Sequence, residues 1–147
     1  MTPLNKAAVR FIVVHCSATP PDADIGADEI RRWHVEDNGW SDIGYHYVIR
    51  RAGVIEHGRS LDYQGAHVRG YNHESVGICL VGGVNEDAQP DANFTAAQYG
   101  SLESLISLLL PRFPGAAVRG HRDFPGVTKA CPSFDAAAWW SQRNENA

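Results

Sequence analysis

Two histidines and one cysteine occupy positions from which they could bind a divalent metal ion together. His15 follows the apolar run 11–14 and His121 follows the run 116–120, and both runs predict strands. The sheet holds side chains at strand ends rigidly while the adjoining loops open a site, so functional groups concentrate there. Cys131 follows His121 by ten residues, across a loop whose prolines and glycine can turn the thiol back towards the imidazole. Two imidazoles and one thiolate suit Zn²⁺, and three protein ligands leave a fourth position for water.

The spacing of these three residues is by itself compatible with two interpretations. One is a catalytic zinc site, and the other is a set of unrelated packed or exposed residues, because dispersed histidines and cysteines are common. Cys16 competes as a ligand, but neighbours on a regular strand point to opposite faces, so His15 and Cys16 are not expected to share one site. We therefore expect Cys16 to pack as a small buried hydrophobe, and Cys79 to do the same inside the run 76–81.

The composition is that of a soluble globular protein and argues against several classes of function. The chain has 147 residues, of which 44% are hydrophobic and 20% charged, with a net charge of −4, and this length fits one compact domain. It contains no basic run, so we expect no nucleic-acid partner. Its apolar runs are too short to span a bilayer or to form a signal peptide, so we expect no membrane partner and no export signal. An odd, small number of cysteines indicates synthesis in a reducing compartment.

Hydrophobic periodicity predicts strands and helices in alternation, which is typical of an α/β domain. The second and third expected strands form a hairpin around a turn that contains Gly53. The predicted organisation is a flexible N-terminal arm at residues 1–10 and one α/β domain at residues 11–147, with a central sheet flanked by helices. Strands are expected at 11–14, 45–49, 54–57, 76–81 and 116–120.

Three helices are expected to cover this sheet. The first spans 28–37 and is stopped by Gly39. The second follows Thr95, because Thr95 and Gln98 have the spacing of a capping box, and Pro111 ends it. The third spans 135–143 and closes the chain.

Several longer motifs run in unbroken order between residues 11 and 140, and together they resemble a known family. The chain is similar to type 2 N-acetylmuramoyl-L-alanine amidases, most closely the zinc amidases of T-odd bacteriophages, and more distantly to peptidoglycan recognition proteins. The motifs are VHCSAT around His15, EIRRWH at 29–34, GYHY at 44–47, GYNHESVGICLVGG at 70–83, DANFT at 91–95 and KACPSFD at 129–135.

The resemblance implies a fold, a cofactor and a set of site residues. The fold is a central mixed sheet flanked by helices, and the cofactor is one Zn²⁺ per chain held by His15, His121 and Cys131. The family's catalytic tyrosine and lysine fall on Tyr45 and Lys129. The expected reaction is hydrolysis of the amide between the lactyl group of N-acetylmuramic acid and L-alanine in bacterial peptidoglycan. Two polar residues of the loop before the third central strand are expected to line the substrate cleft, namely His67 and Asn72.

Other functions and partners follow from the same resemblance. The main alternative is a peptidoglycan-binding module without catalysis, which relatives become when the cysteine ligand is missing, and a zinc hydrolase of another amide is a further alternative. A second role in binding and inhibiting a phage RNA polymerase is also expected. We expect a monomer that is made in the host cytoplasm and acts on peptidoglycan in the periplasm once the inner membrane is permeabilised, contributing to host lysis.

Overall fold

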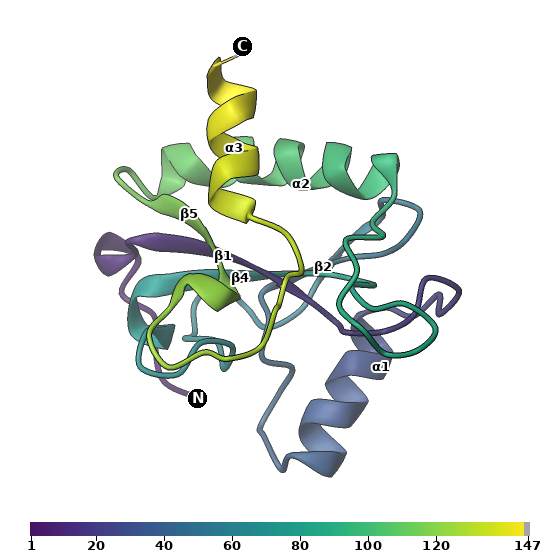
Figure 1. The fold of residues 1–147 in the computed structure, drawn as a ribbon. Helices are drawn as coiled ribbons and strands as arrows, with labels where there is room; N and C mark the ends of the chain where they lie inside the picture. The colour runs from purple at the N-terminus through teal and green to yellow at the C-terminus, as the bar shows by residue number, and fades with distance from the viewer. Residues whose placement is uncertain (146–147) are drawn as a thin grey trace.

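The computed structural model describes residues 1–145 and has a five-stranded mixed sheet at its centre (Figure 1). Four neighbouring strands are parallel and the edge strand β3 is antiparallel to β2, which confirms the predicted mixed α/β fold and its hairpin. The strand order is β3-β2-β4-β1-β5. The bounds are Phe11–Cys16 for β1, Tyr47–Ile49 for β2, Ile55–His57 for β3, Ser75–Leu80 for β4 and Ala117–Gly120 for β5.

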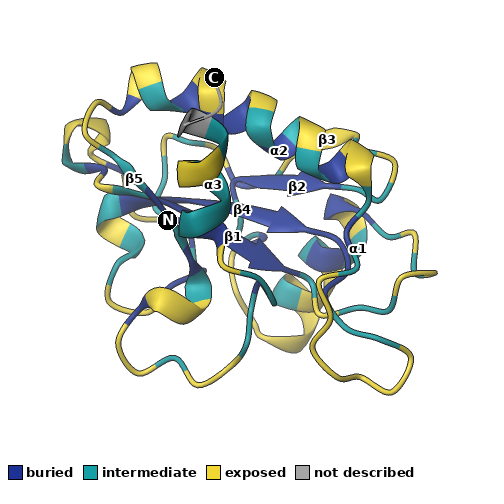
Figure 2. Cartoon of the chain, turned by 45° about the horizontal axis from the view of Figure 1, so that its top comes forward, coloured by how far each residue is buried: buried dark blue, intermediate teal, exposed yellow. Residues whose placement is uncertain are grey.

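Helices cover both faces of the sheet, because alternate residues of its central strands point to opposite sides (Figure 1). Ile12 and Val14 of β1 pack with Leu102 and Ile106 of α2 (Ala96–Leu109). On the other face, Cys79 packs with Ile30 of α1. Figure 2 shows the resulting layers, with the buried central strands β1, β2 and β4 between half-exposed helices. The remaining helices are α1 (Ala27–Arg32) and α3 (Ala136–Glu145).

The predicted helix boundaries are confirmed to within a residue or two, with one irregularity. The first helix runs to Asp37 as expected, but its second half (Trp33–Asp37) is a π-helix. Thr95 caps α2, because its hydroxyl accepts from the Gln98 N–H at 3.1 Å while the Gln98 side chain accepts from the Thr95 N–H at 3.0 Å. Gln98 also donates to the carbonyls of Ile49 and Val81, so the start of α2 is fixed to the end of β2 and to the residue that follows β4.

The second strand is shorter than the sequence predicts. It begins at Tyr47 and leaves Tyr45 in the preceding loop. Backbone hydrogen bonds continue irregularly beyond the strand, since Gly58 and Arg59 donate to the carbonyls of His46 and Tyr45. Tyr45 is therefore positioned by the sheet without belonging to a regular strand.

The segment before β1, expected to be a loose arm, contributes two side chains to the core. Leu4 and Val9 are buried, and the Leu4 N–H donates to the Asp62 carbonyl at 2.9 Å. The sequence hides these contacts because Leu4 stands between Pro3 and Asn5, and Arg10 separates Val9 from the apolar run 11–14. Among the described residues, no helix is long and apolar enough to cross a membrane.

Candidate active site

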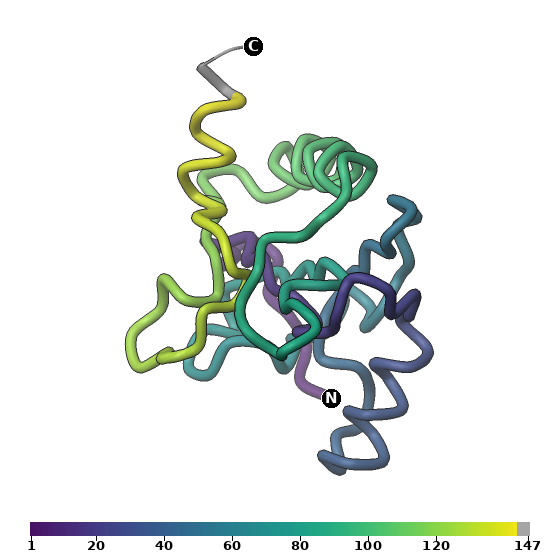
Figure 3. The backbone as a smooth tube through the Cα atoms, turned by 45° about the vertical axis from the view of Figure 1, so that its right-hand side comes forward, coloured from purple at the N-terminus to yellow at the C-terminus, as the bar shows by residue number. Residues whose placement is uncertain are grey.

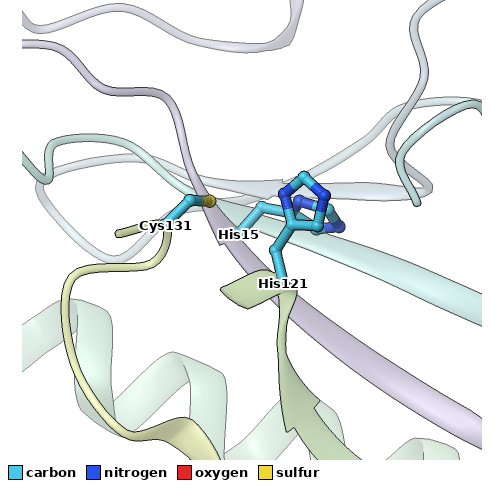
Figure 4. A group of neighbouring side chains, drawn as sticks. All are labelled: His15, His121 and Cys131. Atoms are coloured by element: carbon cyan, nitrogen blue, oxygen red, sulfur yellow. The ribbon is translucent and has the colours of Figure 1, made fainter. Parts of the chain in front are cut away.

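The three predicted ligands His15, His121 and Cys131, called the trio below, converge at one edge of the sheet. His15 lies near the end of β1, and His121 directly follows β5, its parallel neighbour. Parallel strands end at the same edge, so these imidazoles meet, with ring centroids 4.5 Å apart. Cys131 joins them from the loop before α3. This loop leaves the sheet after β5 and then comes back to it (Figure 3). One metal-ligating atom from each residue lies within 4.8 Å of the others, and the three side chains point towards one another (Figure 4).

Backbone groups hold the loop that carries Cys131. The Cys131 sulfur accepts a hydrogen bond from the Cys16 N–H at 3.2 Å, and the Cys131 carbonyl accepts from the Arg122 N–H at 2.8 Å. Cys16 is buried, as predicted, yet it also contacts the site. Strand alternation does not forbid this contact, because Cys16 is the last residue of β1 and Cys131 lies beyond the strand end.

Burial and hydrogen bonding keep the side chains of the three candidate ligands uncharged. It lowers the pKa of His15 well below its ordinary value, with further contributions from His67 and His121. Burial and the nearby Lys129 ammonium lower the pKa of His121. The hydrogen bond with the Cys16 thiol and burial raise the pKa of Cys131. Neutral imidazoles are the ligating form, and a bound cation would draw the proton from the thiol, so this N, N, S donor set fits Zn²⁺.

Tyr45 packs against the candidate ligand His15. Their ring centroids are 5.0 Å apart and the planes are tilted by 51°. Burial raises the pKa of Tyr45 well above its ordinary value, and the thiols of Cys79 and Cys131 raise it further. The phenol therefore holds its proton at neutral pH and is available as a hydrogen-bond donor beside the trio.

Lys129 is exposed, two residues before Cys131, and lines the same cleft as Cys131. Its charge is close enough to lower the pKa of His121. The structure thus places both expected catalytic side chains beside the trio, since Tyr45 packs on His15 and Lys129 lines the cleft of Cys131.

The two residues expected to bind substrate lie beside the trio in a second cleft. His67 is buried, and its Nδ1 is 2.8 Å from Nε2 of His15. The Asn72 side-chain oxygen accepts from the N–H groups of His67 and Val68, so Asn72 shapes the loop that carries His67.

The trio lies between two clefts. His121 lines one cleft with Trp40, Arg69 and Gly70, while Cys131 lines the other with Val84, Pro90 and Lys129. An extended substrate can therefore cross the sheet edge with its reactive bond over the trio and an arm in each cleft.

Sequence reasoning missed two residues that shape this site. Trp40 lines the cleft of His67 and His121 with a partly exposed ring, and the signal available was an aromatic residue directly after the helix-stopping Gly39. Arg59 is a buried cation that donates to the carbonyls of Asp42, Ile43 and Gln64, tying together the loops that lead to Tyr45 and His67. No local sequence pattern marks Arg59, because its partners are backbone carbonyls.

Known proteins similar to this chain are amidases and endolysins. Residues 5–134 match the family described as N-acetylmuramoyl-L-alanine amidase. The endolysin of Escherichia phage T7 is 51% identical over 141 residues, which cover 96% of this chain and 91% of that protein.

Solved structures of an amidase and of a peptidoglycan recognition protein have the same fold as this chain. The N-acetylmuramoyl-L-alanine amidase LysC from Clostridium intestinale has a TM-score of 0.79 at 28% identity, covering 99% of this chain and 91% of that one. Bumblebee PGRP-SA has a TM-score of 0.78 at 23% identity, covering 96% and 84%, and shares the fold. With the family match at residues 5–134 and an endolysin relative 51% identical over most of its length, the chain belongs to the N-acetylmuramoyl-L-alanine amidases, enzymes that act on peptidoglycan.

Proposed function

We propose that this amidase is a zinc-dependent endolysin that hydrolyses the amide between the lactyl group of N-acetylmuramic acid and L-alanine. The observation that carries the zinc dependence is the approach of His15, His121 and Cys131 to within 4.8 Å of one another. The chemistry that Zn²⁺ supplies when held by these residues is activation of a water molecule near neutral pH and polarisation of the scissile carbonyl.

Two other side chains complete the proposed mechanism. Lys129 stabilises the negative charge that develops on the carbonyl oxygen, because its ammonium group reaches the cleft beside Cys131. Tyr45 orients the attacking water with its protonated hydroxyl, a role that its raised pKa supports. One of these two groups delivers the proton to the leaving L-alanine amine, so that the amide bond breaks as the new carboxylate forms.

The two clefts support the peptidoglycan substrate. The bond to be cut joins a sugar-bearing lactyl group to a peptide, so a substrate arm extends from each side of that bond. A trio between two clefts accommodates both arms, and Trp40, Arg69 and Asn72 supply aromatic and polar groups in one of them.

The experiment that tests this proposal is digestion of purified cell wall by the zinc-loaded protein. We expect new L-alanine amino termini and intact glycan chains by mass spectrometry, loss of activity with a chelator, and recovery with zinc. Cys131→Ser should lose bound zinc and cleavage together. Full zinc content and full rate in Cys131→Ser would contradict the ligand assignment, and tight wall binding without release of amino termini would favour the non-catalytic alternative.

The biological setting and a second role rest on the resemblance to endolysins of T-odd phages. We propose synthesis in the host cytoplasm and action on periplasmic peptidoglycan after permeabilisation of the inner membrane, contributing to lysis. The second role is binding and inhibition of a phage RNA polymerase. Transcription by a single-subunit phage polymerase with and without this protein tests the second role, which fails if a stoichiometric excess leaves transcript yield unchanged.

A further inference from the structure

His67 occupies a fixed position under the ligand His15. Its side chain lies against Gly77 of β4, where an alanine Cβ would come within 2.7 Å of the His67 Cγ. The same ring faces Gly65, where a Cβ would come within 2.6 Å of the His67 Cδ2. Two glycines therefore make the space that the imidazole fills, and the ring cannot shift towards either of them.

A chain of hydrogen bonds leads from His15 through His67 to the backbone. The His15 Nε2 is 2.8 Å from the His67 Nδ1, the His67 Nε2 is 3.2 Å from the Ser75 hydroxyl, and that hydroxyl is 2.8 Å from the Tyr71 carbonyl oxygen. The chain is buried at its centre, since Ser75 is 0% and His67 8% exposed. Every polar atom of the His67 ring thus has a partner within the protein.

The carbonyl at the end of this chain fixes the direction of every proton in it. A carbonyl oxygen only accepts, so the Ser75 hydroxyl donates to Tyr71. The Ser75 oxygen then accepts from Nε2–H of His67, which leaves the His67 Nδ1 as a bare acceptor. His15 must therefore donate from Nε2–H, and its Nδ1 carries a free lone pair.

We propose that His67 is a positioning residue that holds His15 in the tautomer whose Nδ1 is free to bind the metal. This inference rests on the proposed zinc function, and it changes the role expected of His67. A ring whose two nitrogens are both engaged by the protein has none left for substrate, so His67 acts through His15.

If these hydrogen bonds ran in the opposite direction, His15 could not bind the metal through Nδ1. If His67 carried its proton on Nδ1, His15 would accept at Nε2 and its own proton would sit on Nδ1, where a metal must bind. The Ser75 hydroxyl would then donate to His67, and its oxygen would face the Tyr71 carbonyl oxygen at 2.8 Å without a proton between them. Metal-ligating histidines commonly donate their other N–H to a partner that fixes the ring in this way.

The first test needs no substitution and no metal. Long-range ¹H–¹⁵N correlation spectra of the metal-free wild-type protein at pH 7.5 identify which nitrogen of each imidazole is protonated. We expect the proton of His15 on Nε2 and that of His67 on Nε2. A His67 ring protonated on Nδ1, or a His15 ring protonated on Nδ1, would overturn the proposal whatever the outcome of the wall-digestion experiment.

Two variants of the same residue separate positioning from packing. His67→Phe keeps the ring and removes the acceptor, whereas His67→Asn puts a carbonyl oxygen near the position of Nδ1. In competition with a chromophoric chelator, we expect His67→Phe to bind zinc roughly 10- to 100-fold more weakly than wild type, and His67→Asn to recover most of that loss. Equal zinc affinity in His67→Phe and wild type would overturn the proposal.

A third variant covers the case in which His67→Phe does not fold. Ser75→Ala removes the acceptor for Nε2–H of His67 and leaves His67 itself in place. We expect a mixture of His67 tautomers in its metal-free spectra and a smaller loss of zinc affinity, and unchanged spectra would contradict the proposed chain. If the wild-type protein binds no zinc at all, the proposed zinc-dependent function fails. The metal-free spectra still decide on their own which nitrogens of His15 and His67 are protonated.

Discussion

At the scale of single residues, the site consists of groups that burial keeps neutral, with exposed cations in the two clefts beside it. Burial lowers the pKa of the histidines and raises the pKa of Tyr45. Lys129 is the exposed cation in the cleft of Cys131, and Arg69 is an exposed cation in the cleft of His121. A neutral pocket favours zinc binding because unprotonated imidazoles bind metal, and the phenol and ammonium groups remain available as donors.

Tyr45→Phe and Lys129→Ala should each slow wall cleavage and leave zinc bound. Removing the phenol hydroxyl or the ammonium group takes away a donor for the transition state, which is worth roughly 10²- to 10³-fold in rate. Zinc content by atomic emission and the rate of amino-terminus release are the measurements. Lys6→Ala is the matched control, since Lys6 pairs with Asp62 at the surface. Loss of zinc from Tyr45→Phe would show that Tyr45 supports His15 structurally.

The buried histidines should make the metal-free protein less stable at acidic pH. Burial lowers the pKa of His46 below its ordinary value of 6.5, as does Arg59, and the hydrogen bond to Tyr63 opposes them. The unfolded chain therefore binds the proton first as pH falls, so this stability is complete above about pH 6.5 and declines below it.

Urea unfolding of metal-free protein between pH 7.5 and 5.0 measures this decline. Each such histidine contributes a slope of at most about 1.4 kcal/mol per pH unit in the free energy of unfolding. His46→Asn should have a shallower slope than wild type, and His73→Gln, at an exposed position, should not. Identical slopes for wild type and His46→Asn would contradict the view that buried His46 lowers the stability at acidic pH.

At the scale of elements, the ends of parallel strands and the shape of their neighbours set the site. Adjacent parallel strands β1 and β5 end together, and this brings His15 to His121. Gly77 of β4 has no side chain, so the His67 imidazole packs directly on this strand. From there His67 contacts the candidate ligand His15 of the neighbouring strand β1.

Gly77→Ala should destabilise the fold and weaken zinc binding. The added methyl group would meet the His67 ring between 2.7 and 2.9 Å, and overpacking of this kind costs about 1–3 kcal/mol. Gly100→Ala is the matched control in α2, where an added methyl group meets no atom within 4 Å and should stabilise the helix by about 0.5–1 kcal/mol. Urea unfolding measures both, and equal stability of the two variants would show that the ring moves freely.

At the scale of the whole molecule, the trio connects segments that are distant in sequence. Its residues come from β1, from the end of β5 and from the loop before α3. A metal bound there would link the first strand to the last third of the chain.

Zinc should therefore raise the thermal stability of the whole domain. A ligand at 100 times its Kd stabilises the folded state by about 2.7 kcal/mol. Differential scanning calorimetry with zinc and with a chelator measures the shift in Tm, which should be absent in Cys131→Ser. A Tm that does not respond to zinc in the wild type would show that the metal does not bridge these segments.

Local patterns in the sequence were enough to predict most of the elements. The capping box at Thr95 and the apolar runs before His15 and His121 identify α2, β1 and β5, because capping and hydrophobic periodicity depend on nearby residues. The motifs also identified the family and the candidate ligands. They did not mark the buried Leu4 and Val9, because neither residue belongs to a segment with a strand or helix period.

Only the tertiary structure decided how the candidate ligands are supported. The contacts of His67 with His15 and Gly77, and those of Arg59 with backbone carbonyls, join residues that are far apart in sequence. Such contacts depend on strand order and loop paths, which no local pattern specifies. The sequence thus determined which chemical groups are available, and the packing of β1, β4 and β5 determined which of them face one another, because side chains meet through the sheet rather than along the chain.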